Sequence, residues 1–492
     1  MNRSTLSLAA AVAALAAVTG LAALAAPGGS TAAEAKAPAR LPVERTSLLC
    51  PAPSQSDLAE TTYTSFTPAS TGGGTASGKA QLLPSATAKK KTDKPVVSLT
   101  QTGKPATGTA SGGAAPALIG SADGALAPGW TAQQTTAVTV GGARGLLGTD
   151  CTAPDTDFWF PGTSTEADRQ DYVHLTNPDD SAAVADIELY GKDGRIASDV
   201  GEGITIPAHG SVPVLLSTLI PAKTPGLTVH VSTRSGRVGA VVQSMDDKLG
   251  SDWLPASAAA ARKQVLPGIP ADATDVQLVA YAPGSDDADL KIQLAGADGT
   301  IIPAGFETLH VKAGMTAAVD LKNVNRGVAG SLVLSPSGDG SSAPVVAALK
   351  VVRGKGTKQE VAFIPAAEPV GERATAADNR AKGSTLSLLA PEGAAKVKVT
   401  ASAGSGGGTP VVKTYTIKAG TTLAVTPEAP SGLKGAYALT VEPEPGSGPV
   451  YASRTLEVPQ GGVPMFTVQT LSDDRGTVAV PVADEDLSLL ND

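Results

Sequence analysis

Short stretches in which apolar and polar residues alternate recur along the chain and predict β-strands. Three of them end in proline: YVHLTNP (172–178), VQLVAYAP (276–283) and LSLLAP (386–391). Their final prolines lie 105 and 108 residues apart. A second alternating stretch follows each one, starting at Val184, Ala288 and Ala394. The pattern predicts that one unit built of strands occurs three times.

Turn signals keep the same spacing. Asp193-Gly194 and Asp298-Gly299 follow the second strand of the first two units, and such pairs supply the positive φ of a tight hairpin. A closing hairpin is expected later in each unit, from Leu227, Ser331 and Tyr437, with a further copy from Thr136. An aromatic-x-Pro signature is expected to bound the units, at WFP (159–161), WLP (253–255) and FIP (363–365).

A period of about 105 residues is too long for solenoid repeats or propeller blades. It favours an all-β chain of tandem β-sandwich domains of the immunoglobulin-like type, each about 100 residues long. We expect full repeats at residues 163–260, 261–366 and 367–492, and a more divergent N-terminal unit at 38–162.

Three segments are predicted to lie outside this pattern of strands. Residues 67–116 are rich in Gly, Ala, Thr, Ser and Lys and are expected to form a flexible insertion, ordered only at 96–100. Helix is expected only in short connectors such as 257–263. The acidic end of the chain, ADEDLSLLND, is expected to be a frayed tail.

The first 37 residues have the layout of an export signal. Arg3 precedes an uncharged stretch of Ala, Leu and Val from Leu6 to Ala26, and small-x-small sites follow between Thr31 and Ala37. As a helix the apolar stretch would reach roughly 31 Å, so an uncleaved membrane anchor is the alternative to a cleaved signal peptide. Either case predicts an extracytoplasmic protein, secreted or anchored to the cell membrane by an N-terminal helix.

Cys50 and Cys151 are the two cysteines, and in an exported chain they are expected to form a disulfide. Closing a loop of about 100 residues should stabilise the N-terminal unit by about 4.7 kcal/mol in the chain-entropy model. Lipidation is disfavoured because Cys50 lies far beyond the apolar stretch and follows Leu49 rather than a small residue. A catalytic thiol is disfavoured because no basic partner is evident.

Composition argues against a nucleic-acid partner, which would favour a basic stripe with stacking aromatics. The net charge is −8, and the chain has three Trp, seven Tyr and six Phe among 492 residues. The dense basic run Lys89 to Lys91 could contact an anionic wall polymer or lipid, or be simply solvated.

No catalytic motif and no cofactor-binding motif is found. His174 and His230 alternate with apolar strand residues and are predicted on solvated polar faces. His209 is expected in a turn, and no two of the four histidines have metal-ligand spacing.

Acidic residues give the weak candidates for a metal site. Asp246, Asp247 and Asp252 fall in expected loops near a junction between units, where carboxylates could hold Ca²⁺ or simply form turns and add charge. Paired carboxylates could also hydrolyse a glycoside, although aromatic platforms for a sugar are scarce. Trp159 and Trp253 occupy equivalent boundary positions and are predicted to serve packing.

Several segments together carry a family resemblance: RTSLLCPAPS, GLLGTDCTAPDTDFWFPG, YVHLTNP with GKDG, and GSDWLPAS. They resemble a family of large exported proteins of high-GC Gram-positive bacteria whose function is unknown. The resemblance covers most of residues 44–492. It implies an extracytoplasmic protein with an N-terminal signal or anchor, and it supplies no catalytic residues.

Two functions remain. The first is a non-catalytic cell-envelope protein, secreted or membrane-anchored, that scaffolds or binds wall polymer or an envelope protein. The alternative is an enzyme acting on wall glycan or peptide, with a site at a domain junction built from Asp246, Asp252 or His209 with its neighbouring acids. A sugar-binding module is disfavoured by the small number of aromatic residues.

Overall fold

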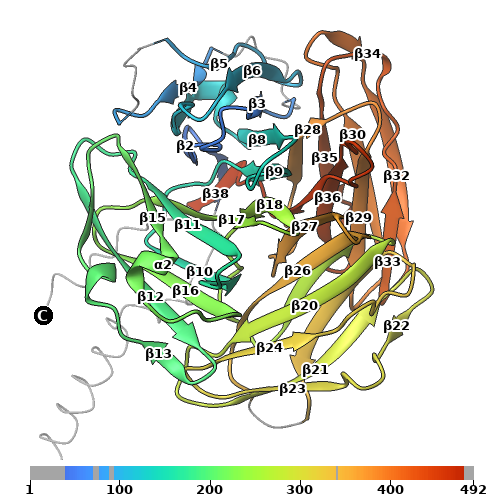
Figure 1. Ribbon diagram of the computed structural model, residues 1–492. Helices are drawn as coiled ribbons and strands as arrows, with labels where there is room; N and C mark the ends of the chain where they lie inside the picture. The colour runs from blue at the N-terminus through green and yellow to red at the C-terminus, as the bar shows by residue number, and fades with distance from the viewer. Residues whose placement is uncertain (1–38, 70–76, 88–93, 339–341, 481–492) are drawn as a thin grey trace, which may run out of the picture. The chain divides into compact units, whose positions relative to one another are not determined.

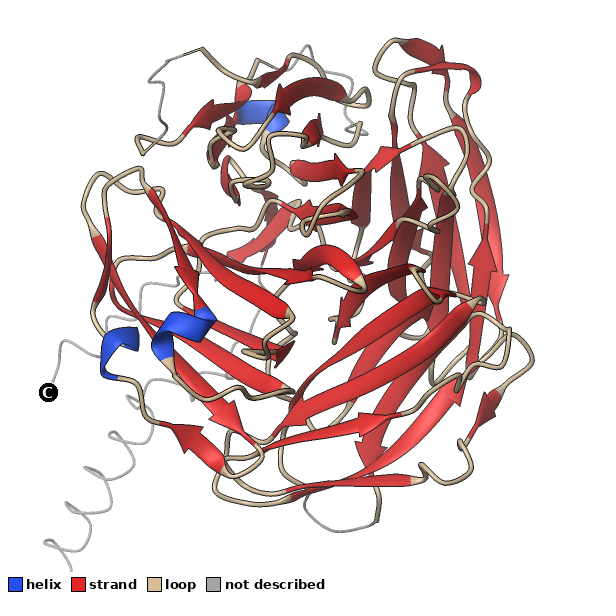
Figure 2. Cartoon of the chain, viewed as in Figure 1, coloured by secondary structure: helices blue, strands red, loops and turns tan. Residues whose placement is uncertain are grey.

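The computed structural model describes residues 39–69, 77–87, 94–338 and 342–480, and strands dominate them (Figure 1; Figure 2). Helices in these ranges are single turns: η1 (Gly124–Leu126), η2 (Asp199–Gly201) and α2 (Leu216–Leu219). The predicted all-β class is therefore confirmed. The expected helical connector at 257–263 is wrong, because this segment is irregular chain ending in a bridge and a bend.

Two predicted features lie outside the described residues: the signal peptide or anchor at 1–37 and the acidic tail. No helix in the described part of the chain has the length and apolar character that a membrane span requires.

Residues 45–471 form four sets of strands, here called modules 1 to 4 (Figure 1). Module 1 contains β2 (Arg45–Cys50), β3 (Glu60–Phe66), β4 (Ala80–Pro84), β5 (Val97–Leu99), β6 (Ala106–Ser111), β7 (Leu118–Asp123), β8 (Thr131–Val138) and β9 (Gly145–Asp150). Module 2 contains β10 (Asp157–Thr163), β11 (Arg169–Thr176), β12 (Ala183–Gly191), β13 (Gly194–Ile196), β14 (Ile204–Ile206), β15 (Ser211–Leu215), β16 (Leu227–Ser235), β17 (Gly239–Asp246) and β18 (Gly250–Leu254).

The two later modules follow the same plan. Module 3 contains β19 (Gln264–Ile269), β20 (Ala273–Tyr281), β21 (Ala288–Ala295), β22 (Thr300–Ile301), β23 (Thr308–Val311), β24 (Thr316–Asp320), β25 (Gly330–Pro336), β26 (Val346–Lys355) and β27 (Lys358–Pro365). Module 4 contains β28 (Ala374–Asn379), β29 (Ser384–Ala390), β30 (Ala395–Ala401), β31 (Gly407–Thr409), β32 (Val411–Ile417), β33 (Thr421–Val425), β34 (Ser431–Lys434), β35 (Tyr437–Pro443), β36 (Tyr451–Glu457) and β37 (Phe466–Leu471).

One strand order is common to all four modules. The first sheets run β2-β7-β4-β5, β10-β16-β12-β13, β19-β25-β21-β22 and β28-β35-β30-β32. The second sheets run β6-β3-β8-β9, β15-β11-β17-β18, β24-β20-β26-β27 and β33-β29-β36-β37. Within each module, apolar residues of both sheets share one core, so each module is β-sandwich-like.

The alternating stretches found in the sequence are strands β11, β20 and β29, followed by β12, β21 and β30. The Asp193-Gly194 turn joins β12 to β13, and Gly194 has φ 103°. The predicted closing hairpins are wrong, because the chain crosses there from one sheet to the other: β16 pairs with β10 and β12, whereas β17 pairs with β11 and β18. The copy from Thr136 is a hairpin, β8–β9, at a different place in the module.

Module 1 contains strands where a flexible insertion was expected, so that prediction is wrong for the described parts of residues 67–116. In β4 and β5, Ala80, Leu82, Val97 and Leu99 point into the core. Strand β6 consists of small residues because neighbouring chain lies close to it. A Cβ on Gly108 would lie 2.2 Å from the carbonyl oxygen of Val96.

The aromatic-x-Pro segments do not mark equivalent places. WFP (159–161) lies in β10, the first strand of module 2, so the expected boundary at residue 162 falls inside a strand. WLP (253–255) and FIP (363–365) mark the ends of modules 2 and 3, in and directly after β18 and within β27.

The chain divides into two compact units, and the four modules belong to the one that spans Pro42–Gly476. The other unit includes a two-stranded antiparallel sheet of β1 (Ala39–Pro42) and β38 (Thr477–Val480). In this small sheet the Arg40 guanidinium donates hydrogen bonds to Thr477 Oγ1 at 2.9 and 3.1 Å.

The last strands of the four modules, β9, β18, β27 and β37, contact one another in a closed cycle. Strands β9, β18 and β27 are labelled near the centre of Figure 1. Each of them packs one face on the module that precedes it. Phe363 of β27 joins the core of module 2, and Phe466 of β37 joins the core of module 3. Trp253 of β18 packs on Leu147 of module 1, and β9 closes the cycle by packing Leu146 against Leu456 and Met465 of module 4.

Candidate functional site

The predicted disulfide is confirmed. Cys50 and Cys151 are joined, their Cα atoms lie 4.3 Å apart, and both side chains are buried in the core of module 1. Cys151 directly follows β9, and the Leu49 and Thr152 backbones exchange hydrogen bonds beside it. The bridge therefore anchors the end of the strand that module 1 contributes to the closed cycle.

The three aspartates singled out as metal candidates have separate roles. Asp246 ends β17, and its Oδ1 accepts the backbone N–H groups of Lys248 and Leu249, each at 2.9 Å. Asp247 is exposed, whereas Asp252 lies within β18 and is fully buried, so its expected loop position is wrong. Within the described residues, no three His, Cys, Asp or Glu side chains gather in a way that could hold a metal ion.

Asp252 lies where the four last strands meet. Its Oδ1 accepts the backbone N–H of Gly148 in β9 at 3.0 Å and the hydroxyl of Thr467 in β37 at 3.1 Å. Its Oδ2 is buried without a hydrogen-bond partner. Burial raises the pKa of Asp252 well above its usual range, although the hydrogen bonds to Gly148 and Thr467 lower it.

Glu360 of β27 supplies a second carboxyl at the same place. Its Oε2 accepts a hydrogen bond from Arg144 at 2.6 Å, and its Oε1 accepts the backbone N–H of Leu146 at 3.3 Å. Burial raises the pKa of Glu360 to about 8, against the lowering effect of Arg144. We call Arg144, Gly148, Asp252, Glu360 and Thr467 the central cluster, because it joins all four modules.

Two glycines of β9 allow this close packing. A Cβ on Gly148 would lie 2.5 Å from Cγ2 of Thr467, and one on Gly145 would lie 2.1 Å from the carbonyl oxygen of Ser251. Both carboxyls of the cluster are fully buried. The arrangement holds the modules together, and neither carboxyl is exposed to a substrate.

Sequence reasoning missed Glu360, and it also missed a second buried polar group where module 1 meets module 4. Arg454 of β36 is fully buried and donates to Oε1 of Gln133 at 3.1 Å. The same Gln133 oxygen also accepts a hydrogen bond from the backbone N–H of Asp378. The Asp378 carboxylate in turn accepts, through Oδ2, a hydrogen bond from the Thr135 hydroxyl at 2.7 Å. A usable signal was present, because Asp252 directly precedes the apolar residues Trp253 and Leu254, and Glu360 directly precedes the apolar run from Val361 to Pro365.

The histidines divide into one buried residue and three that pair with acids. His174 was expected to be solvated, and this is wrong: it is 3% exposed beside Trp253, and burial lowers its pKa to about 4.

His230 faces outward as expected but is mostly covered, with Nδ1 3.1 Å from Glu188 and Nε2 2.8 Å from Asp157. His209 is exposed in a turn and contacts Asp180 at 2.7 Å, and His310 contacts Asp289 at 2.8 Å.

An aromatic group covers the junction of modules 2 and 3. The Trp159 ring stacks on His230 with 3.8 Å between centroids and on Tyr281 of module 3 with 5.1 Å. Tyr190 lies 4.6 Å from Tyr281 by the same measure. The predicted packing role of Trp159 and Trp253 is confirmed, although their positions in the modules are not equivalent.

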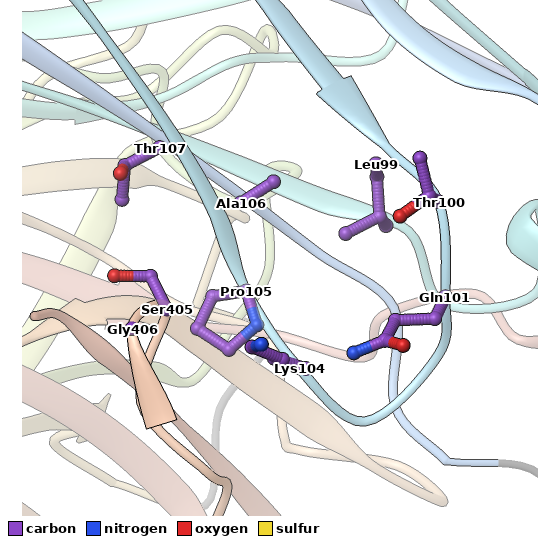
Figure 3. A pocket seen from close by; sticks show the side chains of 9 residues that line it. All are labelled: Leu99, Thr100, Gln101, Lys104, Pro105, Ala106, Thr107, Ser405 and Gly406. Carbon is purple, nitrogen blue, oxygen red and sulfur yellow. The ribbon is translucent and has the colours of Figure 1, made fainter. Parts of the chain in front are cut away.

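One open pocket of about 430 Å³ lies at another junction, between modules 1 and 4 (Figure 3). Its wall from module 1 is the chain from the end of β5 into β6, and Ser405 and Gly406 line it from module 4. Lys104 is the charged residue of the lining. The Lys89 to Lys91 run lies outside the described residues.

The fold and these sites define an all-β protein of β-sandwich-like modules in which the carboxyls of Asp252 and Glu360 are buried between modules. Residues 106–428 match the model of a family of unknown function, DUF5719, and the chain belongs to this family. The match extends from β6 of module 1 into module 4 and thus includes modules 2 and 3 entirely. No curated protein matches the chain significantly.

Proposed function

We propose that the protein is a non-catalytic component of the cell envelope that binds a wall polymer or an envelope protein through a scaffold of four immunoglobulin-like modules. We place it outside the cytoplasm, secreted or anchored by its N-terminal segment, in a high-GC Gram-positive bacterium. The signal-like layout of residues 1–37 and the disulfide of Cys50 and Cys151 support this location.

The observation that carries the proposal is the use of acidic residues at the junctions. The two carboxyls that meet there, Asp252 and Glu360, are fully buried and bind backbone N–H groups, a hydroxyl and a guanidinium of other modules. Such a network fixes the modules relative to one another. Rigid modules present loops and pocket walls in a constant geometry, which lowers the entropic penalty of binding.

The alternative, an enzyme acting on wall glycan or peptide, has one observation in its favour. Asp252 and Glu360 are neighbouring carboxyls with raised pKa values, a combination that also occurs at acid–base active sites. Catalysis would require β9, β18, β27 and β37 to separate so that a substrate could reach these groups.

The test uses residues 38–492, purified in the oxidised state and incubated with insoluble cell wall from a related bacterium. After centrifugation, the pellet is assayed for protein and the supernatant for released sugar and peptide. The proposal predicts protein in the pellet and no released fragments, also for Asp252→Asn. Fragments released by the wild type and not by Asp252→Asn would establish the enzyme instead. Protein that stays in the supernatant without releasing fragments would overturn the wall as the partner.

A further inference from the structure

The pocket between modules 1 and 4 has walls that are fixed before any ligand arrives. On the side of module 1, Gly103 donates its backbone N–H to Thr67 at 2.8 Å, which holds the turn between β5 and β6. On the side of module 4, the backbone N–H groups of Ser405 and Gly406 are bound by Ala436 and Lys434 at 2.7 and 2.9 Å. A pocket held in this way loses little entropy when it is filled.

The lining is polar, unlike that of most small-molecule sites, which are mainly apolar. It offers the hydroxyls of Thr100, Thr107 and Ser405 and the amide of Gln101 (Figure 3). The volume of about 430 Å³ falls within the usual range for ligand sites. These groups donate and accept hydrogen bonds, so they match a ligand that carries several hydroxyls.

Lys104 adds a positive charge to this lining, and no carboxylate lines the pocket. Its side chain is half-buried and has no ion pair or hydrogen bond within the described part of the chain. Some described lysines are held by carboxylates, for example Lys398 by Glu442 at 2.8 Å and Lys248 by Asp168 at 2.8 Å, whereas no described carboxylate holds Lys104. An unpaired ammonium beside hydroxyls and an amide favours an anionic ligand.

We propose that this pocket binds a short anionic, hydroxyl-rich segment of a cell-wall polymer, a polyol phosphate, with the Lys104 ammonium against its negative charge. The inference rests on the proposed wall-binding function and specifies the site and the chemistry of the ligand. Because the walls come from the first and the last module, the ligand bridges the two modules at which the cycle closes.

The test is isothermal titration of residues 38–492 with soluble poly(glycerol phosphate), alongside neutral oligomers of N-acetylglucosamine. We expect the wild type to bind the anionic polymer more tightly than the neutral one, with an affinity that falls as salt increases. Lys104→Ala should bind about tenfold more weakly, the usual effect of losing a hydrogen bond to a charged group. Lys104→Arg, and Lys79→Ala at an exposed lysine of the same module, should stay within about twofold.

Thr107→Trp provides a second variant, because this exposed side chain of β6 can fill the pocket without removing a charge. It should also weaken binding. Equal affinity of the wild type and Lys104→Ala, or equal binding of the anionic and neutral polymers, would overturn the site. Wall binding by the wild type without binding of the soluble polymer would overturn the ligand class and leave the proposed function standing. The proposed wall-binding function fails if the wild type does not bind wall, or if it releases fragments that Asp252→Asn does not release.

Discussion

The central cluster and the pocket are both polar regions at junctions between modules, and they use their charges in opposite ways. In the central cluster, Asp252 and Glu360 are fully buried and receive hydrogen bonds from other modules. In the pocket, Lys104 is half-buried and has no partner in the described chain. A buried polar group must be satisfied by the protein itself, whereas an unpaired charge at an opening can be satisfied by a ligand. We therefore assign a structural role to the central cluster and a ligand-binding role to the pocket.

The largest expected loss of stability follows from removing the disulfide between Cys50 and Cys151, which anchors strand β9 of the central cluster. Replacing both Cys50 and Cys151 by alanine removes the bridge that closes a 101-residue separation and anchors the end of β9. We expect the free energy of unfolding to fall by about 4.7 kcal/mol. Denaturant titration of the oxidised wild type and the double variant measures this. A loss below about 1 kcal/mol would show that β9 is held by packing alone.

Removing the carboxyl at the centre should have the next largest effect. Asp252→Ala leaves the buried N–H of Gly148 without its acceptor, leaves the Thr467 hydroxyl only the longer hydrogen bond to the Gly148 carbonyl at 3.4 Å, and opens a small cavity. We expect a loss of about 3 kcal/mol in denaturant titration. Asp247→Ala, at an exposed aspartate of the same module, should change stability by less than about 0.5 kcal/mol. Equal effects of the two variants would remove the distinction between the cluster and the surface.

The pH dependence of stability tests the structural role of Glu360. Glu360 has its pKa raised by burial from 4.5 to about 8, so between these values the folded protein holds a proton that the unfolded chain has released. The free energy of unfolding should therefore fall as the pH rises through this window, by up to about 1.4 kcal/mol per pH unit. Glu360→Gln should reduce this slope in melting curves recorded from pH 5 to 8. An unchanged slope would assign the effect to other groups.

The smallest expected effect on stability belongs to the pocket. Lys104→Ala removes no hydrogen bond or ion pair within the described chain, so its free energy of unfolding should differ from that of the wild type by less than about 0.5 kcal/mol. The melting temperatures of the two proteins should therefore match. A loss similar to that of Asp252→Ala would show that Lys104 serves the fold rather than a ligand.

The sequence predicted the all-β class and the repeated strands because local alternation determines which residues face the core. Strand β12 shows this directly, with every second residue buried from Ala183 to Gly191. The same reasoning failed for β6, whose small residues show no apolar alternation and are held by pairing with β3.

The sites were harder to predict because their contacts are made by distant parts of the chain. Alternation correctly placed His174 outside the core of its own module, but Trp253 and the neighbouring module cover that face. Asp252 was noticed for its position near a junction, yet the groups that bind it lie 104 and 215 residues away. No spacing rule within one repeat relates such residues, so the central cluster required the structure.

The closed cycle implies that the four modules form one body held together by their last strands. Hydrogen exchange followed by mass spectrometry on peptides covering β9, β18, β27 and β37 tests it most directly. These strands lie at the edges of their own sheets, where exchange is ordinarily fast. We predict slow exchange in all four strands of the wild type and faster exchange in all four strands of Asp252→Ala. Fast exchange in these strands, or acceleration confined to module 2, would contradict the closed cycle.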